Sequence, residues 1–120
     1  MKTVYVLVNE SLKMSKGKAC SQVAHAMAKL AAKCDLGNFG LNNPNKIVVL
    51  SATDHHQIDN IAEYLTEQCL DFAIYIDEGN HETPPFSETA MAIQPLDPIR
   101  HEEIIDIFSV MPTYPKKKFF

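Results

Sequence analysis

The sequence lacks any long run of apolar residues, although 46% of its 120 residues are hydrophobic. A helix that crosses a membrane needs roughly 20 consecutive apolar residues, and no stretch comes near that length. The first eight residues enter a strand pattern directly, without the cleavage site of a secretory signal peptide. We therefore expect a cytoplasmic protein that has no contact with a membrane.

Cysteine is scarce and is poorly spaced for a structural role. Cys20, Cys34 and Cys69 are odd in number, and no two of them form a CxxC motif. This spacing argues against both a disulfide framework and a cysteine zinc site. The adjacent His55 and His56 indicate an exposed helix start rather than a metal site, because neighbouring residues on a helix diverge in direction. We expect reduced thiols, with Cys20 and Cys69 packed in the core, and no bound metal.

The chain also lacks internal repeats and low-complexity tracts. Its length suits one domain with a single modest core, and a content of 22% charged residues is ordinary for a globular protein. We therefore expect residues 1–120 to form one domain.

Positive charge is concentrated in the first part of the chain, although the whole sequence has a formal net charge of −4. Residues 1–46 hold seven lysines against two acidic residues, a net charge of +5. Residues 47–115 hold one arginine against 13 acidic residues, a net charge of −12. A polyanion is therefore expected to dock on the surface that carries the first helix.

The chain ends in the basic and aromatic tail KKKFF. A solvated terminus is the simpler interpretation of lysines 116–118. For Phe119 and Phe120, packing against a partner subunit and fraying in solvent are both open interpretations.

Apolar residues alternate between strand-like runs and helical spacing along most of the chain. The order of these patterns is β-α-β-α-β-β-α, which predicts a three-layer α/β/α sandwich with helices on both faces of a mostly parallel sheet. The two consecutive strands, 71–76 and 88–93, need not be parallel to each other. Ligand sites are then expected at the carboxyl ends of the strands. The expected strands are 3–8, 46–52, 71–76 and 88–93; the expected helices are 16–33, one capped by Thr53 or Asp54 that ends at Gln68, and 99–108; the expected site segments are 9–15, 51–54 and 77–85.

The segment 12–26, LKMSKGKACSQVAHA, begins the first helix at that edge. Lys18, Gln22 and His25 are spaced i, i+4 and i+7, so they share one helix face. Ser15 is a good N-cap, and Lys16 and Lys18 fall in the first turn, where the helix dipole disfavours cations. This placement predicts a bound anion such as phosphate. The alternative is a solvated amphipathic helix with ordinary surface lysines.

The same segment resembles the start of the second type of peptidyl-tRNA hydrolase, the archaeal and eukaryotic kind. The family has a strand, a Lys-Met-Gly-Lys-Gly-Lys stretch and a helix with Gln and an Ala-His-Ala or Ser-His-Ala step, and Ser15 replaces the first Gly here. The similarity continues without gaps from residue 77 to residue 89 and covers nearly the full chain. The matching residues in the segment are Lys13, Met14, Lys16, Gly17, Lys18, Gln22, His25 and Ala26.

The resemblance implies hydrolysis of the ester that joins a peptide to the terminal ribose of tRNA, with no cofactor. It also implies a mixed four-stranded sheet flanked by helices, tRNA as the partner, and commonly a homodimer. The family's catalytic residues correspond to Lys18, Asp77 and Thr89. We expect four residues to bind the substrate: Lys13, Lys16, Gln22 and His25.

These residue types suit ester hydrolysis. Lys18 supplies positive charge for a developing oxyanion, Asp77 holds the ammonium in place, and the Thr89 hydroxyl orients the attacking water. His25 is either a supporting donor or a contact of the terminal adenosine. Each residue also has a structural interpretation, since Asp77 suits a turn and Thr89 suits a strand surface.

The chain departs from the family in the loop after Asp77. Where the family has Arg, Thr and Gln, this chain has Asn80, His81 and Glu82, which removes a cation and adds a negative charge. Two alternative functions follow from this loop. One is a non-catalytic module that binds RNA or a nucleotide, and the other is a hydrolase of a different small acyl or phosphorylated substrate.

Overall fold

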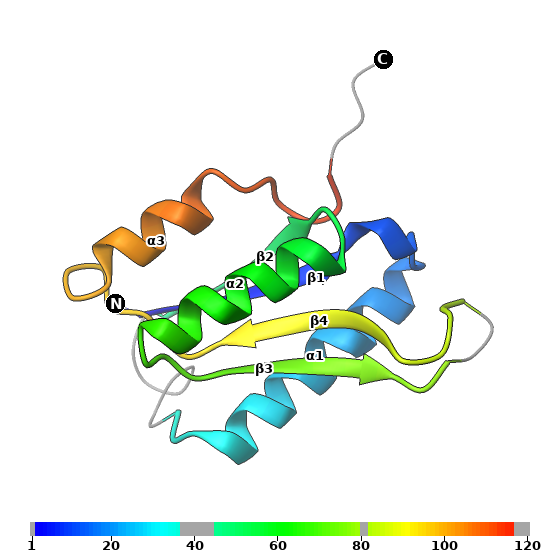
Figure 1. The fold of residues 1–120 in the computed structure, drawn as a ribbon, viewed down its shortest axis with the longest axis horizontal. Coiled ribbons are helices and arrows are strands. Elements are labelled where there is room, and N and C mark those ends of the chain that lie inside the picture. The colour runs from blue at the N-terminus through cyan, green and yellow to red at the C-terminus, as the bar shows by residue number, and fades with distance from the viewer. Residues whose placement is uncertain (1, 37–44, 80–81, 117–120) are drawn as a thin grey trace.

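A computed structural model describes residues 2–36, 45–79 and 82–116 of the chain. Strands and helices follow one another in the expected order and form a layered structure (Figure 1). None of the described helices is long and apolar enough to cross a membrane. The elements are β1 (Thr3–Asn9), η1 (Glu10–Leu12), α1 (Lys16–Lys33), β2 (Lys46–Ala52), α2 (His55–Glu67), β3 (Phe72–Asp77), β4 (Ser87–Ile93) and α3 (Glu102–Ser109).

The four strands form one mixed sheet in the order β2-β1-β4-β3. β1 and β2 are parallel, whereas β4 is antiparallel to both of its neighbours, β1 and β3. The expectation of a mostly parallel sheet is therefore wrong. Its cause is the direct step from β3 to β4: without a crossover helix between them, the chain turns back and inserts β4 between β3 and β1. The mixed four-stranded sheet is confirmed.

This topology gathers several chain segments at one edge of the sheet. β1, β2 and β3 run in the same direction, so their carboxyl ends share that edge with the amino end of β4. Asn9 at the end of β1 donates a hydrogen bond from Nδ2 to the Glu88 carbonyl oxygen at 3.0 Å. The two strand ends are thereby tied together beside the start of α1, at the edge that the sequence predicts.

Helices cover both faces of the sheet, which confirms the three-layer α/β/α sandwich. Alternate residues of β1 point to opposite faces. Val4 and Val6 pack with Leu30 of α1, whereas Tyr5 and Leu7 pack with residues of α2 and α3. The Tyr5 ring stacks on that of Phe108 in α3, with centroids 4.9 Å apart.

Small residues allow α1 to lie close to the sheet. Ala26 of α1 is fully buried against Ala73, Ala90 and Ala92 of β3 and β4. Farther along α1, Lys29 and Lys33 donate from Nζ to the carbonyl oxygens of Ile74 and Phe72, each at 2.8 Å. These bonds fix α1 over β3, an edge strand, and therefore fix the relative position of the residues that the two elements bring together.

The last helix begins later than the sequence predicts. The expected helix is 99–108, but α3 starts at Glu102 and residues 98–101 form turns. The Asp97 carboxylate accepts hydrogen bonds from the backbone of Ile99 and Arg100, at 2.9 and 3.0 Å. Asp97 thus caps a single turn, in which the His101 backbone N–H donates to the Asp97 carbonyl oxygen at 2.9 Å, and the regular helix begins only after this turn, at Glu102.

The expected burial of two cysteines is also wrong, since Cys20 and Cys69 are exposed. Cys20 follows the buried Ala19 on α1, and the next residue of a helix faces a different direction. Cys69 lies just after α2 with a φ of 58°, in a turn that directs it to solvent. Cys34 is the half-buried thiol, packed beside the α1 face of the core.

Candidate active site

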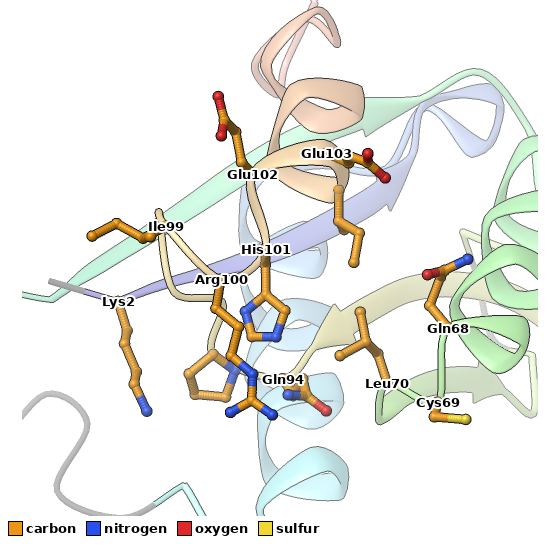
Figure 2. A pocket seen from close by; sticks show the side chains of 12 residues that line it. Lys2, Gln68, Cys69, Leu70, Gln94, Ile99, Arg100, His101, Glu102 and Glu103 are labelled. Carbon is orange, nitrogen blue, oxygen red and sulfur yellow. The ribbon is translucent and has the colours of Figure 1, made fainter.

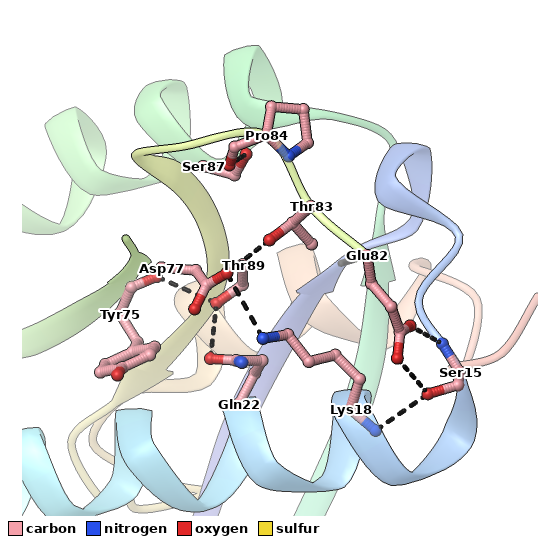
Figure 3. A network of polar contacts seen from close by, with 10 residues as sticks. All are labelled: Ser15, Lys18, Gln22, Tyr75, Asp77, Glu82, Thr83, Pro84, Ser87 and Thr89. Carbon is pink, nitrogen blue, oxygen red and sulfur yellow. Dashed lines mark hydrogen bonds and ion pairs between the residues drawn. The ribbon is translucent and has the colours of Figure 1, made fainter. Parts of the chain in front are cut away.

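An ion pair links α1 to the end of β3. Lys18, in the first turn of α1, places Nζ 3.3 Å from Oδ2 of Asp77, the last residue of β3 (Figure 3). The two side chains are 11% and 13% exposed, so the pair is largely withdrawn from water and yet open on one side. A cation and an anion 59 residues apart in the sequence meet at the predicted edge.

The loop after β3 holds Asp77 in its charged form. The Thr83 hydroxyl donates a short hydrogen bond to Asp77 Oδ2, and the backbone N–H of Gly79 donates to the same carboxylate. The Thr83 hydrogen bond, followed by Lys18, lowers the pKa of Asp77 below its ordinary value. At neutral pH the carboxylate is therefore ionised and its ammonium partner is held by charge and geometry together.

Gln22 and Thr89 meet beside this pair (Figure 3). Thr89 Oγ1 lies 3.2 Å from the Gln22 side-chain oxygen and 3.1 Å from the Tyr75 carbonyl oxygen. A hydroxyl has one proton, so Thr89 cannot donate to both oxygens. Turning the Gln22 amide by 180° lets its NH₂ donate to Thr89, which then donates to Tyr75. Thr89 is fully buried, so its hydroxyl faces protein partners and not bulk water.

The third residue of the predicted helix face is His25. Its ring stacks on that of Tyr75 in β3, with centroids 4.5 Å apart and planes 9° from parallel. His25 itself is exposed. Lys18, Gln22 and His25 therefore all face the β3 and β4 side of α1, which confirms that they share one face.

At the start of α1, where the sequence predicts a bound anion, the structure places the carboxylate of Glu82. Glu82 accepts hydrogen bonds from the Ser15 backbone N–H at 2.8 Å and from the Ser15 hydroxyl at 2.9 Å. These bonds lower the pKa of Glu82. Ser15 is also the N-cap of α1, since its Oγ accepts from the Lys18 backbone N–H at 3.2 Å.

The structure brings four predicted residues together as two neighbouring pairs, and it leaves Lys13 and Lys16 outside them. Lys18 contacts Asp77, and Gln22 contacts Thr89, whereas Lys13 and Lys16 are exposed near the start of α1. The predicted Asn80 and His81 lie outside the described residues.

Sequence reasoning missed Thr83 and Tyr75 as members of this site. Thr83 precedes Pro84 in a loop whose path no periodic pattern determines, so nothing in the sequence pairs it with Asp77. Tyr75 fits a half-buried strand position, and its contact with His25 depends on how α1 crosses β3. In the described parts of the chain, no group of three or more His, Cys, Asp or Glu residues is placed to hold a metal ion.

Comparison with known proteins identifies the family. The family model for peptidyl-tRNA hydrolase PTH2 matches residues 2–111 of the chain. A peptidyl-tRNA hydrolase of Pyrobaculum aerophilum is 30% identical over an alignment 112 residues long, and this alignment covers 84% of this chain and 87% of that protein. The chain belongs to the peptidyl-tRNA hydrolase PTH2 family. This membership confirms the resemblance read from the lysine-rich segment and the Asp77 loop.

Peptidyl-tRNA hydrolases are ester hydrolases, so the predicted class of enzyme is confirmed at the level of the family, with peptidyl-tRNA as substrate. The match runs through the loop where Asn80, His81 and Glu82 stand. The family comparison does not favour a non-catalytic binding module or a different acyl substrate.

Proposed function

We propose that this chain hydrolyses the ester between the peptide and the terminal ribose of peptidyl-tRNA, with Lys18 and Asp77 as its catalytic pair. The observation that carries the proposal is the largely buried contact between Lys18 Nζ and Asp77 Oδ2 at 3.3 Å. It stands at the sheet edge where the start of α1 meets the carboxyl ends of β1 and β3.

In this mechanism Lys18 acts on charge that develops during the reaction. Water attacks the ester carbonyl carbon, and the carbonyl oxygen becomes negative next to the ammonium. The bond from carbon to the ribose oxygen then breaks. One proton of the attacking water ends on the ribose oxygen, and the other is released when the peptide acid ionises. The products are a peptide carboxylate and a free tRNA end.

Asp77 serves this step by orienting Lys18. Its pKa is lowered, and a carboxylate that holds its proton weakly is a poor general base at neutral pH. Its hydrogen bonds to Thr83 and Gly79 fix the carboxylate, which in turn fixes the position of the ammonium.

Thr89 is proposed as a positioning residue because its hydroxyl is fully buried. By binding both Gln22 and the Tyr75 carbonyl, it fixes the Gln22 amide on the face of α1 that carries Lys18. The attacking water is then oriented through this network and not by direct contact with Thr89.

The other predicted residues are proposed to bind the tRNA end. Lys13 and Lys16 are exposed beside the start of α1, where they are available to phosphates. His25 is supported from behind by Tyr75 and is exposed, which suits stacking against the terminal adenine.

The proposal is tested with an N-acetylated aminoacyl-tRNA as substrate. Lys18→Ala is expected to lower kcat by about 100-fold or more, the usual loss when one charge-stabilising group is removed. Lys46→Ala is the matched control, because Lys46 is exposed at the opposite end of β2. The proposal is wrong if the parent shows no deacylation above buffer, or if Lys18→Ala and Lys46→Ala have equal rates.

We further propose that one domain carries this activity in the cytoplasm as a homodimer. A location in the compartment of translation suits a tRNA substrate. The exposed Ile99 and Val110, which lie before and after α3, offer apolar surface for a second copy. Light scattering across a concentration series tests the dimer, and a constant monomer mass at high concentration contradicts it.

A further inference from the structure

A hollow lies at the end of the sheet opposite to the active site. Its volume is 680 Å³, within the range of about 300–1,000 Å³ that is typical of small-molecule sites. Three segments surround it: the end of α2, the residues that follow β4, and the turn that precedes α3 (Figure 2). None of the described active-site residues lines this hollow, so it is a separate feature of the molecule.

The turn that precedes α3 is fixed by hydrogen bonds between its own residues. The Asp97 carboxylate accepts from the Arg100 backbone N–H at 3.0 Å, and the Asp97 carbonyl accepts from that of His101 at 2.9 Å. The Asp97 backbone N–H donates in turn to Nδ1 of His101 at 2.9 Å. Because Nδ1 accepts, the proton of the neutral imidazole lies on Nε2. The turn thus brings a ring donor of His101 to the hollow next to Arg100.

Gln94, which follows β4, supplies a second donor of fixed orientation. Its backbone N–H donates to the Asp71 carbonyl at 2.9 Å. Its side-chain oxygen accepts from the Asp71 backbone N–H at 2.7 Å. Because this bond occupies the amide oxygen, the NH₂ end of the Gln94 amide is left as a donor at the hollow.

Two cations stand beside these donors. Lys2 and Arg100 are exposed and line the hollow, and in the described parts of the chain neither forms an ion pair with a carboxylate. Figure 2 shows their side chains pointing the same way as the His101 ring, whereas the carboxylates of Glu102 and Glu103 point away from them. Positive charge and oriented donors therefore meet on one side of the hollow.

The surrounding charge favours a small anion over a polyanion. Residues 47–115 hold one arginine against 13 acidic residues, and a nucleic acid would meet this negative charge along its length. A single anionic group mainly meets the charges within a Debye length, about 8–10 Å. The apolar Leu70, Pro95 and Ile104 also line the hollow, so an anionic molecule with an apolar part has surface to pack on.

We propose that this hollow binds a small-molecule phosphate monoester, whose phosphate contacts Arg100, Lys2 and His101. The planar guanidinium of Arg100 offers paired donors that fit two phosphate oxygens. The imidazole Nε2 and the Gln94 amide donate to the remaining oxygens. This site goes beyond the proposed function and does not depend on it.

The experiment titrates inorganic phosphate and phenyl phosphate into the protein and follows its NMR signals. The side-chain NH₂ signals of Gln94 are expected to shift with both probes. Phenyl phosphate is expected to bind several fold more tightly than inorganic phosphate, because its ring packs on the apolar wall.

Two variants that each remove one positive charge test the assigned contacts. Arg100→Gln is expected to weaken phosphate binding by about tenfold or more, because charge-assisted hydrogen bonds are lost. Lys46→Gln is the matched control, since Lys46 is exposed at the same end of the sheet, where it pairs with Thr3, but does not line the hollow. Its affinity is expected to equal that of the parent.

Two exposed thiols locate the bound probe independently. Cys69 lines the hollow, whereas Cys20 lies two residues after Lys18 on α1. Phenyl phosphate is expected to slow the alkylation of Cys69 by iodoacetamide and to leave the rate at Cys20 unchanged. Arg100→Gln is also expected to hydrolyse N-acetylated aminoacyl-tRNA at the rate of the parent, because the two sites are separate.

Several outcomes would overturn the phosphate site. Equal affinities of Arg100→Gln and Lys46→Gln would remove its main contact, and protection of Cys20 in place of Cys69 would put the anion at the start of α1. Protection of Cys69 by unacylated tRNA and not by phenyl phosphate would assign the hollow to RNA. Protection that depends only on protein concentration would assign it to a second copy of the chain.

Discussion

Glu82 binds the cap of α1 through Ser15, with Oε1 2.8 Å from the Ser15 backbone nitrogen. The loop that carries Glu82 also carries Thr83, which holds Asp77. The helix that Ser15 caps carries Lys18 in its first turn. The Glu82 carboxylate thus connects α1, which carries Lys18, to the loop after β3, which holds Asp77. Its position at a helix start also means that it competes there with an incoming phosphate.

The substitution Glu82→Gln tests this competition. The new amide keeps an oxygen that can accept from the Ser15 backbone, but the change removes a negative charge near Lys18. We expect KM for peptidyl-tRNA to fall by a few fold at low salt and the difference to shrink as salt rises, because charge at exposed sites is screened. Steady-state kinetics at two salt concentrations measure this. An unchanged or higher KM at low salt contradicts the competition.

A substitution at Gly17 tests separately how this position affects the stability of the fold and how closely a tRNA phosphate approaches the start of α1. A Cβ at this helical position meets nothing within 4 Å. Gly17→Ala is therefore expected to stabilise the fold by about 0.5–1 kcal/mol, because Gly in a helix costs that much relative to Ala. If phosphate approaches the backbone at the start of α1, the added methyl also raises KM for tRNA. Thermal unfolding and kinetics are measured on the same samples, and a higher melting temperature with unchanged KM rules out close phosphate contact at Gly17.

The raised pKa of Glu88 predicts how the stability of the fold depends on pH. Burial and the neighbouring Asp59 carboxyl raise the pKa of Glu88 to about 7. The folded protein therefore binds a proton that the unfolded chain has released above about pH 4.3. This contribution to stability is complete below that pH and is lost as pH rises through 7. Glu88→Gln is expected to flatten the fall in stability between pH 5 and 8, as measured by urea unfolding. A parallel pH profile for the variant contradicts the assignment.

Most of the fold could be predicted from local patterns, and the failures have physical causes. The bounds of α1 follow from Ser15 as a cap and from alanines at helical spacing, and both predict the helix that the structure contains. The start of α3 could not be predicted, because Asp97 and Pro98 form a capped turn at residues 98–101 that has the local signals of a helix start, whereas the regular helix begins at Glu102. Pairing of strands is non-local, so the antiparallel insertion of β4 is invisible to a pattern of period 2.

The site shows the same division between local and non-local information. The face of Lys18, Gln22 and His25 follows from helix periodicity alone. Their partners come from β3, β4 and the loop between them, and among these partners only Asp77 and Thr89 are predictable from the sequence, because the family resemblance extends to them. Thr83 has no such signal in the sequence. Its contact with Asp77 depends on the turn at Gly79, where φ is +100° and an added Cβ would meet Pro85 at 2.8 Å.

Thr89 tests whether a fully buried hydroxyl supports catalysis through Gln22. Thr89→Val keeps the shape but leaves the Tyr75 carbonyl and the Gln22 amide without their partner. We expect a loss of about 1–3 kcal/mol in stability, the usual cost of an unsatisfied buried polar group.

The kinetic outcome separates a positioning role from a purely structural one. A role in positioning predicts that Thr89→Val lowers kcat at constant KM, because the Gln22 amide and its neighbour Lys18 lose their fixed arrangement. Thr89→Ser restores the hydroxyl and is expected to recover most of kcat while leaving a small cavity in place of the methyl group. If Thr89→Val loses stability but keeps the kcat of the parent under conditions where it is folded, the hydroxyl serves the fold alone. Catalysis then depends on the Lys18 and Asp77 pair and not on the contact between Thr89 and Gln22.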